Sequence, residues 1–165
     1  MSELDEQQAA GSTAVPSMAA SAETISRWNQ QIADEFRANG GKVGGVFEGA
    51  TLALLTTTGA KSGRTLTNPV VYIRYDDGIM LIASNFGRPK NPGWYHNVAA
   101  HPEVKVEIGT RTYEVRAVVT EGAERDRLFA LAVEAQPAYA DYQRGTTRTI
   151  PVVTLAVPDD EPSAP

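Results

Sequence analysis

Apolar residues recur along this chain at two spacings, one typical of amphipathic helices and one typical of half-buried strands. The helical spacing predicts a helix over residues 21–39, which Gly40 and Gly41 stop, and another over residues 123–135, which Pro137 terminates. The inward positions expected in these helices are Ile25, Trp28, Ile32 and Phe36, then Leu128, Phe129, Leu131 and Ala132. A short helix is expected over residues 92–98, with Asn91 as its N-cap and Pro92 at its first position.

Shorter apolar segments predict β-strands at residues 50–58, 68–75, 79–84, 104–108, 113–120 and 150–157. Pro69 cannot donate to a strand ladder, so its end of the second strand is expected at an edge or bulge. Turn residues at 76–78 and 109–110 join neighbouring segments as hairpins. The pattern therefore predicts an α+β fold, a mostly antiparallel six-stranded split β-barrel with flanking helices.

The length and composition fit one domain. The chain has 165 residues, of which 42% are hydrophobic. Residues 1–20 are small, polar and acidic and predict a disordered tail, residues 21–157 form the domain, and residues 158–165 form an acidic, proline-rich tail. The first helix is expected to pack on its own domain; the alternatives are a cover over a ligand or a peripheral membrane contact.

Charge and residue usage exclude several functional classes. A net charge of -5 argues against non-specific nucleic-acid binding, yet Lys61, Arg64 and Arg74 form a stretch without carboxylates that favours a small anionic ligand. The absence of cysteine and the presence of only two histidines argue against disulfides, a cysteine nucleophile and a multi-histidine metal site. The acidic start is unlike a secretory signal, so a soluble, cytoplasmic protein is expected.

Two glycine-containing loops that carry cations and hydroxyls organise the candidate site. Residues 59–64 and 84–91 each follow a predicted strand, and backbone N–H groups in such loops can converge on an anion. The neighbouring aromatic residues are Trp94, Tyr95, Tyr139 and Tyr142. Anion loops beside planar aromatic rings favour a ligand with a charged tail and a flat ring, such as a flavin-like cofactor.

Each of these features has a structural alternative. Residues 59–64 could be an ordinary hairpin loop with solvated cations, and Trp94 could belong to the core. Tyr139 and Tyr142 could simply cover the end of the barrel, while Arg88 and Lys90 could face water.

Taken together, the motifs resemble the deazaflavin-dependent nitroreductase family of actinobacteria. The resemblance covers residues 44–157 and rests on the segments 54–63, 68–69, 83–95, 137–142 and 148–153. It implies a split β-barrel and reduced coenzyme F420 as hydride donor. It also implies acceptors such as quinones, enones and coumarin-like lactones, with nitroimidazole prodrugs in some members.

The resemblance also implies roles for individual residues. Tyr139, Ser84 and Tyr142 would face the substrate, with Tyr139 positioning the acceptor and donating a proton. Lys61 and residues 62–64 would bind the phosphate and polyglutamate tail. Asn68 and Pro69 would line the deazaflavin, and Trp94 would pack by the ring. The phosphate–ribityl portion would be wrapped by Ser84, Asn85, Gly87, Arg88, Lys90 and Asn91. The full set of implied cofactor-binding residues is Lys61, Ser62, Gly63, Arg64, Asn68, Pro69, Ser84, Asn85, Gly87, Arg88, Lys90, Asn91 and Trp94.

Four positions depart from the pattern of that family. Leu66 replaces a second tail-binding arginine, and Asn85 replaces a lysine. Gln136 replaces an additional tyrosine, and Gly93 replaces a larger apolar residue near the ring.

Two functions are alternatives to an F420-dependent reductase. One is a reductase of the same fold that uses flavin mononucleotide, and the other is a non-catalytic F420 carrier. The oligomeric state is expected to be a monomer or a homodimer.

Overall fold

The computed structural model describes residues 21–47, 51–76 and 78–158. The predicted N-terminal tail, Ala50, Asp77 and all but the first residue of the predicted C-terminal tail lie outside the described residues.

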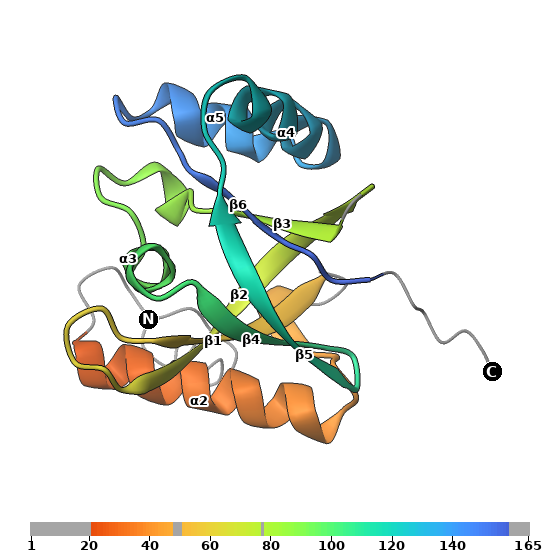
Figure 1. Ribbon diagram of the computed structural model, residues 1–165. Helices are drawn as coiled ribbons and strands as arrows, with labels where there is room; N and C mark the ends of the chain where they lie inside the picture. The colour runs from red at the N-terminus through yellow and green to blue at the C-terminus, as the bar shows by residue number, and fades with distance from the viewer. Residues whose placement is uncertain (1–20, 48–50, 77, 159–165) are drawn as a thin grey trace, which may run out of the picture.

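Six strands close into a barrel in which every pair of neighbours is antiparallel, as the sequence predicts (Figure 1). The order around the barrel is β1-β2-β3-β6-β5-β4. The strands are β1 (Leu52–Thr58), β2 (Thr65–Tyr75), β3 (Gly78–Ile82), β4 (Glu103–Ile108), β5 (Arg111–Val119) and β6 (Val152–Leu155).

Helices cover two opposite sides of this barrel. Figure 1 shows α2 (Ala22–Ala38) along its lower side, and α4 (Gly122–Ala135) with α5 (Ala138–Arg144) along its upper side. Between them, α3 (Gly93–Ala100) packs beside β1. Two short 3-10 turns, η1 (Gly45–Phe47) and η2 (Asn85–Gly87), shape the connections that follow α2 and β3.

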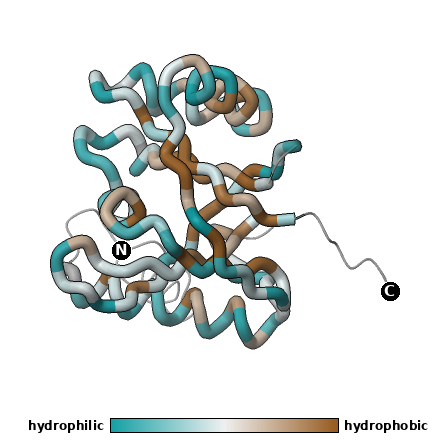
Figure 2. The backbone as a smooth tube through the Cα atoms, viewed as in Figure 1, coloured by the Kyte–Doolittle hydropathy of each residue, from teal (hydrophilic) through white to brown (hydrophobic). Residues whose placement is uncertain are grey.

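Alternation along the strands builds the core, because every second side chain points into the barrel. The barrel interior holds Leu55, Ile79, Leu81, Val106 and Leu155 among its fully buried residues. Separate clusters lie beneath α2 and beneath α4 with α5. Figure 2 shows this as hydrophobic strands at the centre and hydrophilic loops outside.

The first helix packs on its own domain, as predicted, although its apolar stripe is shorter than expected. Ser21 caps α2 by accepting from the backbone N–H of Thr24 at 3.1 Å. Ile32 and Phe36 of this helix are buried, whereas Ile25 is 40% exposed. In α4, Leu128 and Ala132 are buried as expected, but the prediction that Leu131 faces inward is wrong because it is 37% exposed.

Two local predictions need correction. The N-cap of α3 is Pro92 and not Asn91, because the Asn91 side chain instead accepts a hydrogen bond from Arg148. The second strand begins at Thr65, three residues earlier than predicted, since Thr65 pairs with Thr58 across the ladder. Pro69 pairs with Leu54 of β1 on one side of β2. On the other side, β3 pairs with β2 only from Tyr72 onward. Pro69 therefore lies at a local edge of the sheet, as the sequence predicts.

Candidate functional site

One cavity of about 440 Å³ collects most of the aromatic residues that the sequence places near a flat ring. We call it the aromatic cavity. Its wall comes from α2, η1, β2, the end of β3 with the connection after it, the start of α3, and α5. The lining residues are Trp28, Phe47, Pro69, Val70, Val71, Ile82, Ser84, Asn85, Pro92, Trp94, Gln136, Ala138, Tyr139 and Tyr142. The structure thus brings together six of the residues singled out from the sequence, namely Pro69, Ser84, Asn85, Trp94, Tyr139 and Tyr142.

Tyr139 is the most enclosed hydroxyl-bearing residue of that group. Its side chain is 9% exposed, and its ring meets Tyr142 edge-on with 6.2 Å between ring centroids. Burial raises the pKa of the Tyr139 phenol, and the neighbouring Tyr142 raises it further. The phenol is therefore neutral at physiological pH and able to donate a hydrogen bond or a proton.

Trp28 and Phe47 reach the same cavity from α2 and η1, with 5.7 Å between their ring centroids. Sequence reasoning placed Trp28 on the inward stripe of the first helix but did not assign it to the ligand side. The missing signal is the path of the chain after α2, which no periodicity reveals. The first helix therefore both packs on the barrel and borders the cavity.

The cationic loop at residues 59–64 borders a second cavity of about 780 Å³, together with α3. Lys61 and Ser62 line it and are exposed, and Leu66 lies at its edge. The buried side chain of Asn97 fixes this loop: its Oδ1 accepts from the Ala60 N–H at 2.9 Å, and its Nδ2 donates to Thr57 Oγ1 at 3.1 Å. The sequence analysis did not predict this contact. The signal that could have indicated it is that Asn97 is a polar residue on the inner face of a short helix.

The expectation that backbone N–H groups of this loop converge on an anion is wrong for most of its residues. The Gly59 N–H donates to the Arg64 carbonyl at 2.7 Å, and the Gly63 N–H donates back to the Gly59 carbonyl at 3.0 Å. The Arg64 N–H donates to Ser62 Oγ at 3.0 Å. These donors close the turn itself, so the side chains of Lys61 and Arg64 supply most of the attraction of this loop for an anion.

The second loop, residues 84–91, is folded tightly against α5. Asn85 has a positive φ of 49°, and its Nδ2 donates to the Lys90 carbonyl at 2.8 Å. Gly87 has a φ of 78°, and a Cβ built on it would lie 3.2 Å from the Tyr142 carbonyl oxygen. Gly87 and Asn91 thus serve the fold of the loop, while Ser84 and Asn85 reach the aromatic cavity. Arg88 is half-buried and Lys90 is exposed.

Asn68 is one of the residues that the resemblance implies for the cofactor. It lies half-buried in β2 opposite Leu55, and it lines neither of these two cavities.

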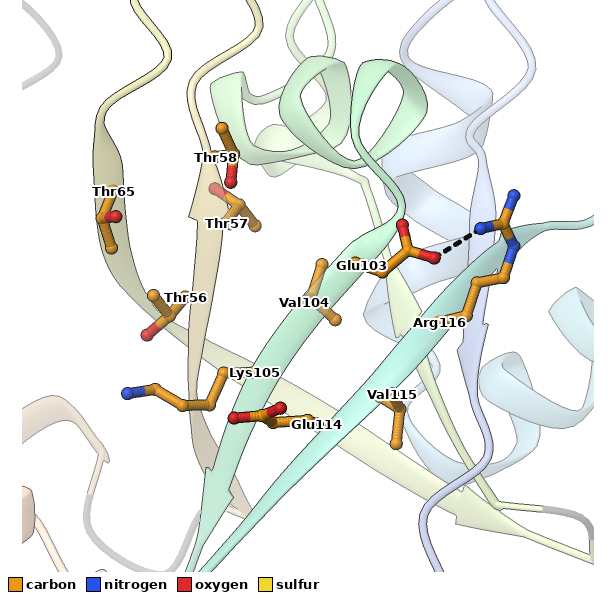
Figure 3. Close-up of a pocket in the computed structure, with 10 residues that line it drawn as sticks. All are labelled: Thr56, Thr57, Thr58, Thr65, Glu103, Val104, Lys105, Glu114, Val115 and Arg116. Atoms are coloured by element: carbon orange, nitrogen blue, oxygen red, sulfur yellow. Dashed lines mark hydrogen bonds and ion pairs between the residues drawn. The ribbon is translucent and has the colours of Figure 1, made fainter.

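A third hollow, of about 480 Å³, lies where β1 and β4 separate (Figure 3). The two strands pair only from Leu54 to Thr56, so Thr57 and Thr58 diverge from β4. Opposite charges alternate along its rim, with Arg116 bonded to Glu103 at 2.5 Å. It contains none of the residues implied for cofactor or substrate, so it is not the candidate site.

Two further features are absent from the described segments. No group of three or more residues with metal-ligating side chains gathers within them. None of their helices combines the length and the hydropathy needed to cross a bilayer.

Comparisons with known proteins agree with one another. A sequence profile described as F420H(2)-dependent quinone reductase matches residues 28–156. A protein of Mycobacterium tuberculosis described as an F420H(2)-dependent quinone reductase is 37% identical over 124 residues, which cover 73% of this chain and 83% of that protein.

Two solved structures are also similar. One, titled as an F420-H2 dependent reductase, is 42% identical with a TM-score of 0.58 and covers 64% of this chain and 93% of its own. Another, titled as a domain-swapped dimer, is 36% identical with a TM-score of 0.61 and covers 82% of this chain and 99% of its own.

Proposed function

The chain belongs to the F420H(2)-dependent quinone reductase family, and from this premise we propose how its two cavities serve the reduction of an electron-poor acceptor. The aromatic cavity would hold the deazaflavin ring and the acceptor. The cationic loop would bind the charged tail of the coenzyme. The observation that carries this proposal is the convergence of Ser84, Tyr139 and Tyr142 on a cavity walled by Trp94 and Pro69.

The residues present fit a coenzyme with a flat ring and an anionic tail. Aromatic and proline side chains give the aromatic cavity planar, apolar walls, which suit a conjugated ring. The second cavity, with Lys61 and Ser62 at its mouth, offers a cation at a solvent-exposed position where an acidic tail can extend. When bound, the reduced deazaflavin supplies the hydride.

The protein itself would contribute positioning and a proton. Trp94 and Pro69 would orient the ring, and Trp28 with Phe47 would restrict water at the far side of the cavity. A neutral Tyr139 would hydrogen-bond to the carbonyl oxygen of the acceptor through its hydroxyl. It would then donate the proton that completes reduction, which its raised pKa keeps in place at neutral pH.

We propose that quinones are the first acceptors, followed by enones and coumarin-like lactones. All three are planar and present a carbonyl oxygen to a hydroxyl donor. Reduction of nitroimidazoles is proposed to be weak, because Asn85 and Gln136, which line the cavity, differ from the residues of the nitroreductase type.

The test is oxidation of reduced F420 by the purified protein with menadione as acceptor, in parallel with reduced flavin mononucleotide. Turnover with F420 alone is the expected result. Turnover with the flavin alone would move the protein to the flavin-dependent alternative. Tight F420 binding without turnover on any quinone, enone or lactone would instead favour a carrier.

A further inference from the structure

Arg148 connects the segment between α5 and β6 to the loop that follows β3. Its Nη2 donates to the Ser84 carbonyl at 2.7 Å, and its Nε donates to the Arg88 carbonyl at 3.0 Å. Its Nη1 donates to the Ala83 carbonyl at 3.3 Å and to Asn91 Oδ1 at 2.6 Å. One guanidinium therefore fixes both ends and the middle of residues 83–91.

Among the described residues, no carboxylate pairs with the positive charge of Arg148. All four of its acceptors are neutral oxygen atoms, and it forms none of the ion pairs found between the described residues. Burial lowers the pKa of its guanidinium, but an arginine remains protonated at neutral pH. A partly buried cation that lacks a countercharge attracts an anion more strongly than a solvated one, because screening is weaker there.

Arg125 provides a contrast within the same molecule. It also donates to a backbone carbonyl, that of Ile150, at 2.8 and 3.0 Å, and to Gln143 Oε1 at 2.9 Å. Unlike Arg148, it is paired with a carboxylate, that of Asp126, at 3.1 Å. Its hydrogen bonds hold the segment before β6 and do not touch residues 83–91, so its role is confined to the scaffold.

The loop that Arg148 holds is the one that reaches the aromatic cavity. Ser84 and Asn85 line that cavity, and the same loop carries the cations Arg88 and Lys90. Anything that fixes this loop therefore fixes one wall of the candidate site. A positive charge beneath the wall would also add to the attraction for an anion bound against it.

We propose that Arg148 is a positioning residue for the phosphate-bearing part of the coenzyme. It holds residues 84–91 in the binding conformation and supplies a partly buried positive charge beneath them. This inference rests on the proposed function, since it requires that the anionic coenzyme binds at this loop.

The decisive experiment compares the affinity of Arg148→Met for coenzyme F420 with its affinity for the same deazaflavin chromophore without phosphate and tail. The expected result is a loss of at least about tenfold for the coenzyme and less than about threefold for the chromophore, since only the coenzyme carries a phosphate and an acidic tail. The coenzyme affinity of the variant should also depend less on ionic strength than that of the wild type.

Arg148→Lys separates the contribution of the positive charge from that of the hydrogen bonds that hold residues 84–91. It also remains informative if Arg148→Met does not fold. Lysine keeps the charge but cannot make the forked contacts to Ser84, Arg88 and Asn91. This variant should retain the salt dependence of coenzyme binding. It should lose hydrogen-exchange protection in residues 84–91, measured without coenzyme, and bind the coenzyme with an affinity between those of the wild type and Arg148→Met.

Arg125→Met is the matched control. It should lower the melting temperature without changing the ratio of the two affinities. Equal losses for coenzyme and chromophore in Arg148→Met, no loss at all, or the same selective loss in Arg125→Met would overturn the role of Arg148 while leaving the proposed function intact. Failure of the wild type to bind either compound would contradict the proposed function itself and this inference with it.

Discussion

At the scale of single residues, the pair Tyr139 and Tyr142 shows how the surroundings of a side chain change its acidity. Tyr139 is buried against Tyr142, and this burial disfavours the phenolate. A phenol held neutral in an apolar cavity suits donation to a carbonyl oxygen. The Ser84 hydroxyl, which also lines the cavity, is more exposed and is a much weaker acid than a phenol, so it suits orientation rather than proton donation.

Tyr139→Phe should reduce turnover about a hundredfold, the usual range for loss of a positioned proton donor. The coenzyme dissociation constant should stay within about twofold, because the hydroxyl is assigned to the acceptor. Stopped-flow rates and a binding titration measure the two quantities. A large loss of coenzyme affinity with unchanged turnover would reverse the assignment.

The same tyrosine should leave a signature in the pH dependence of stability. Its folded-state pKa is raised above the ordinary value of 10.0, so its contribution is complete below pH 10 and is lost as the pH rises through the folded-state value. The free energy of unfolding of the wild type should therefore fall more steeply above about pH 10 than that of Tyr139→Phe. Urea titrations at several alkaline pH values test this, and parallel curves would show that Tyr139 is not shielded from water.

Lys61→Ala should weaken coenzyme binding about three- to tenfold, as expected for a screened surface charge, and the effect should shrink at high salt. Lys42→Ala is the matched control, since Lys42 is equally exposed but lines neither candidate cavity. Equal affinities of the two variants for the coenzyme would show that the cationic loop is not part of the coenzyme site.

At the scale of elements, the position of α2 depends on one bidentate ion pair as well as on packing. Arg37 donates to both carboxylate oxygens of Glu107 on β4, at 3.0 and 2.8 Å. The hydrogen bonds from Arg37 are the main cause of the lowered pKa of Glu107. Since α2 also carries Trp28 to the aromatic cavity, the pair links the barrel to one wall of the site.

A double-mutant cycle with Arg37→Met and Glu107→Gln should give a coupling energy of about 0.5–1 kcal/mol at neutral pH. Because the folded-state pKa of Glu107 is depressed, this stabilisation is present above its ordinary value of 4.5 and is lost as the pH falls through the folded-state value. The exposed pair Glu103–Arg116 serves as a control, with coupling near zero. Coupling that shows no decline as the pH is lowered below 4.5 would show that the pair is not ionic in origin.

Gly87→Ala should lower the free energy of unfolding by about 1–3 kcal/mol, because a Cβ would crowd the backbone of Tyr142 and the φ of 78° disfavours alanine. Gly93→Ala, where a Cβ meets nothing within 4 Å, should stay within about 0.5 kcal/mol of the wild type. Thermal and urea unfolding measure both. If the two substitutions cost the same, the close contact between residues 84–91 and α5 would not be required for stability.

The sequence predicts the type of each element more reliably than it predicts the contacts between elements. Alternation and turn residues predict the antiparallel strands correctly, because both are local signals. Leu131 and Asn91 were misplaced because their surroundings depend on neighbours distant in sequence: the position of α4 on the barrel, and Arg148 reaching back to the β3 loop. Asn97 and Arg148 were not recognised as structural contacts for the same reason.

At the scale of the whole molecule, the closed barrel brings residues from four distant parts of the chain to one cavity. Trp28, Pro69, Ser84 and Tyr139 lie on different elements and meet only because the sheet closes and α5 folds over the end of β3. The resemblance of motifs anticipated much of this grouping. It did not anticipate that the turn at residues 59–64 uses its own backbone donors, which depends on the register of the β1–β2 hairpin.

Under the proposed function, this molecule binds coenzyme F420 through both of its candidate loops, residues 59–64 and 84–91. The most direct measurement is a fluorescence titration of the purified protein with F420 and, separately, with flavin mononucleotide. Saturable binding of F420 that is at least about a hundredfold tighter than that of the flavin is the predicted result, equivalent to ~2.7 kcal/mol of discrimination. Equal or tighter binding of flavin mononucleotide, or no binding of F420, would contradict the proposed function.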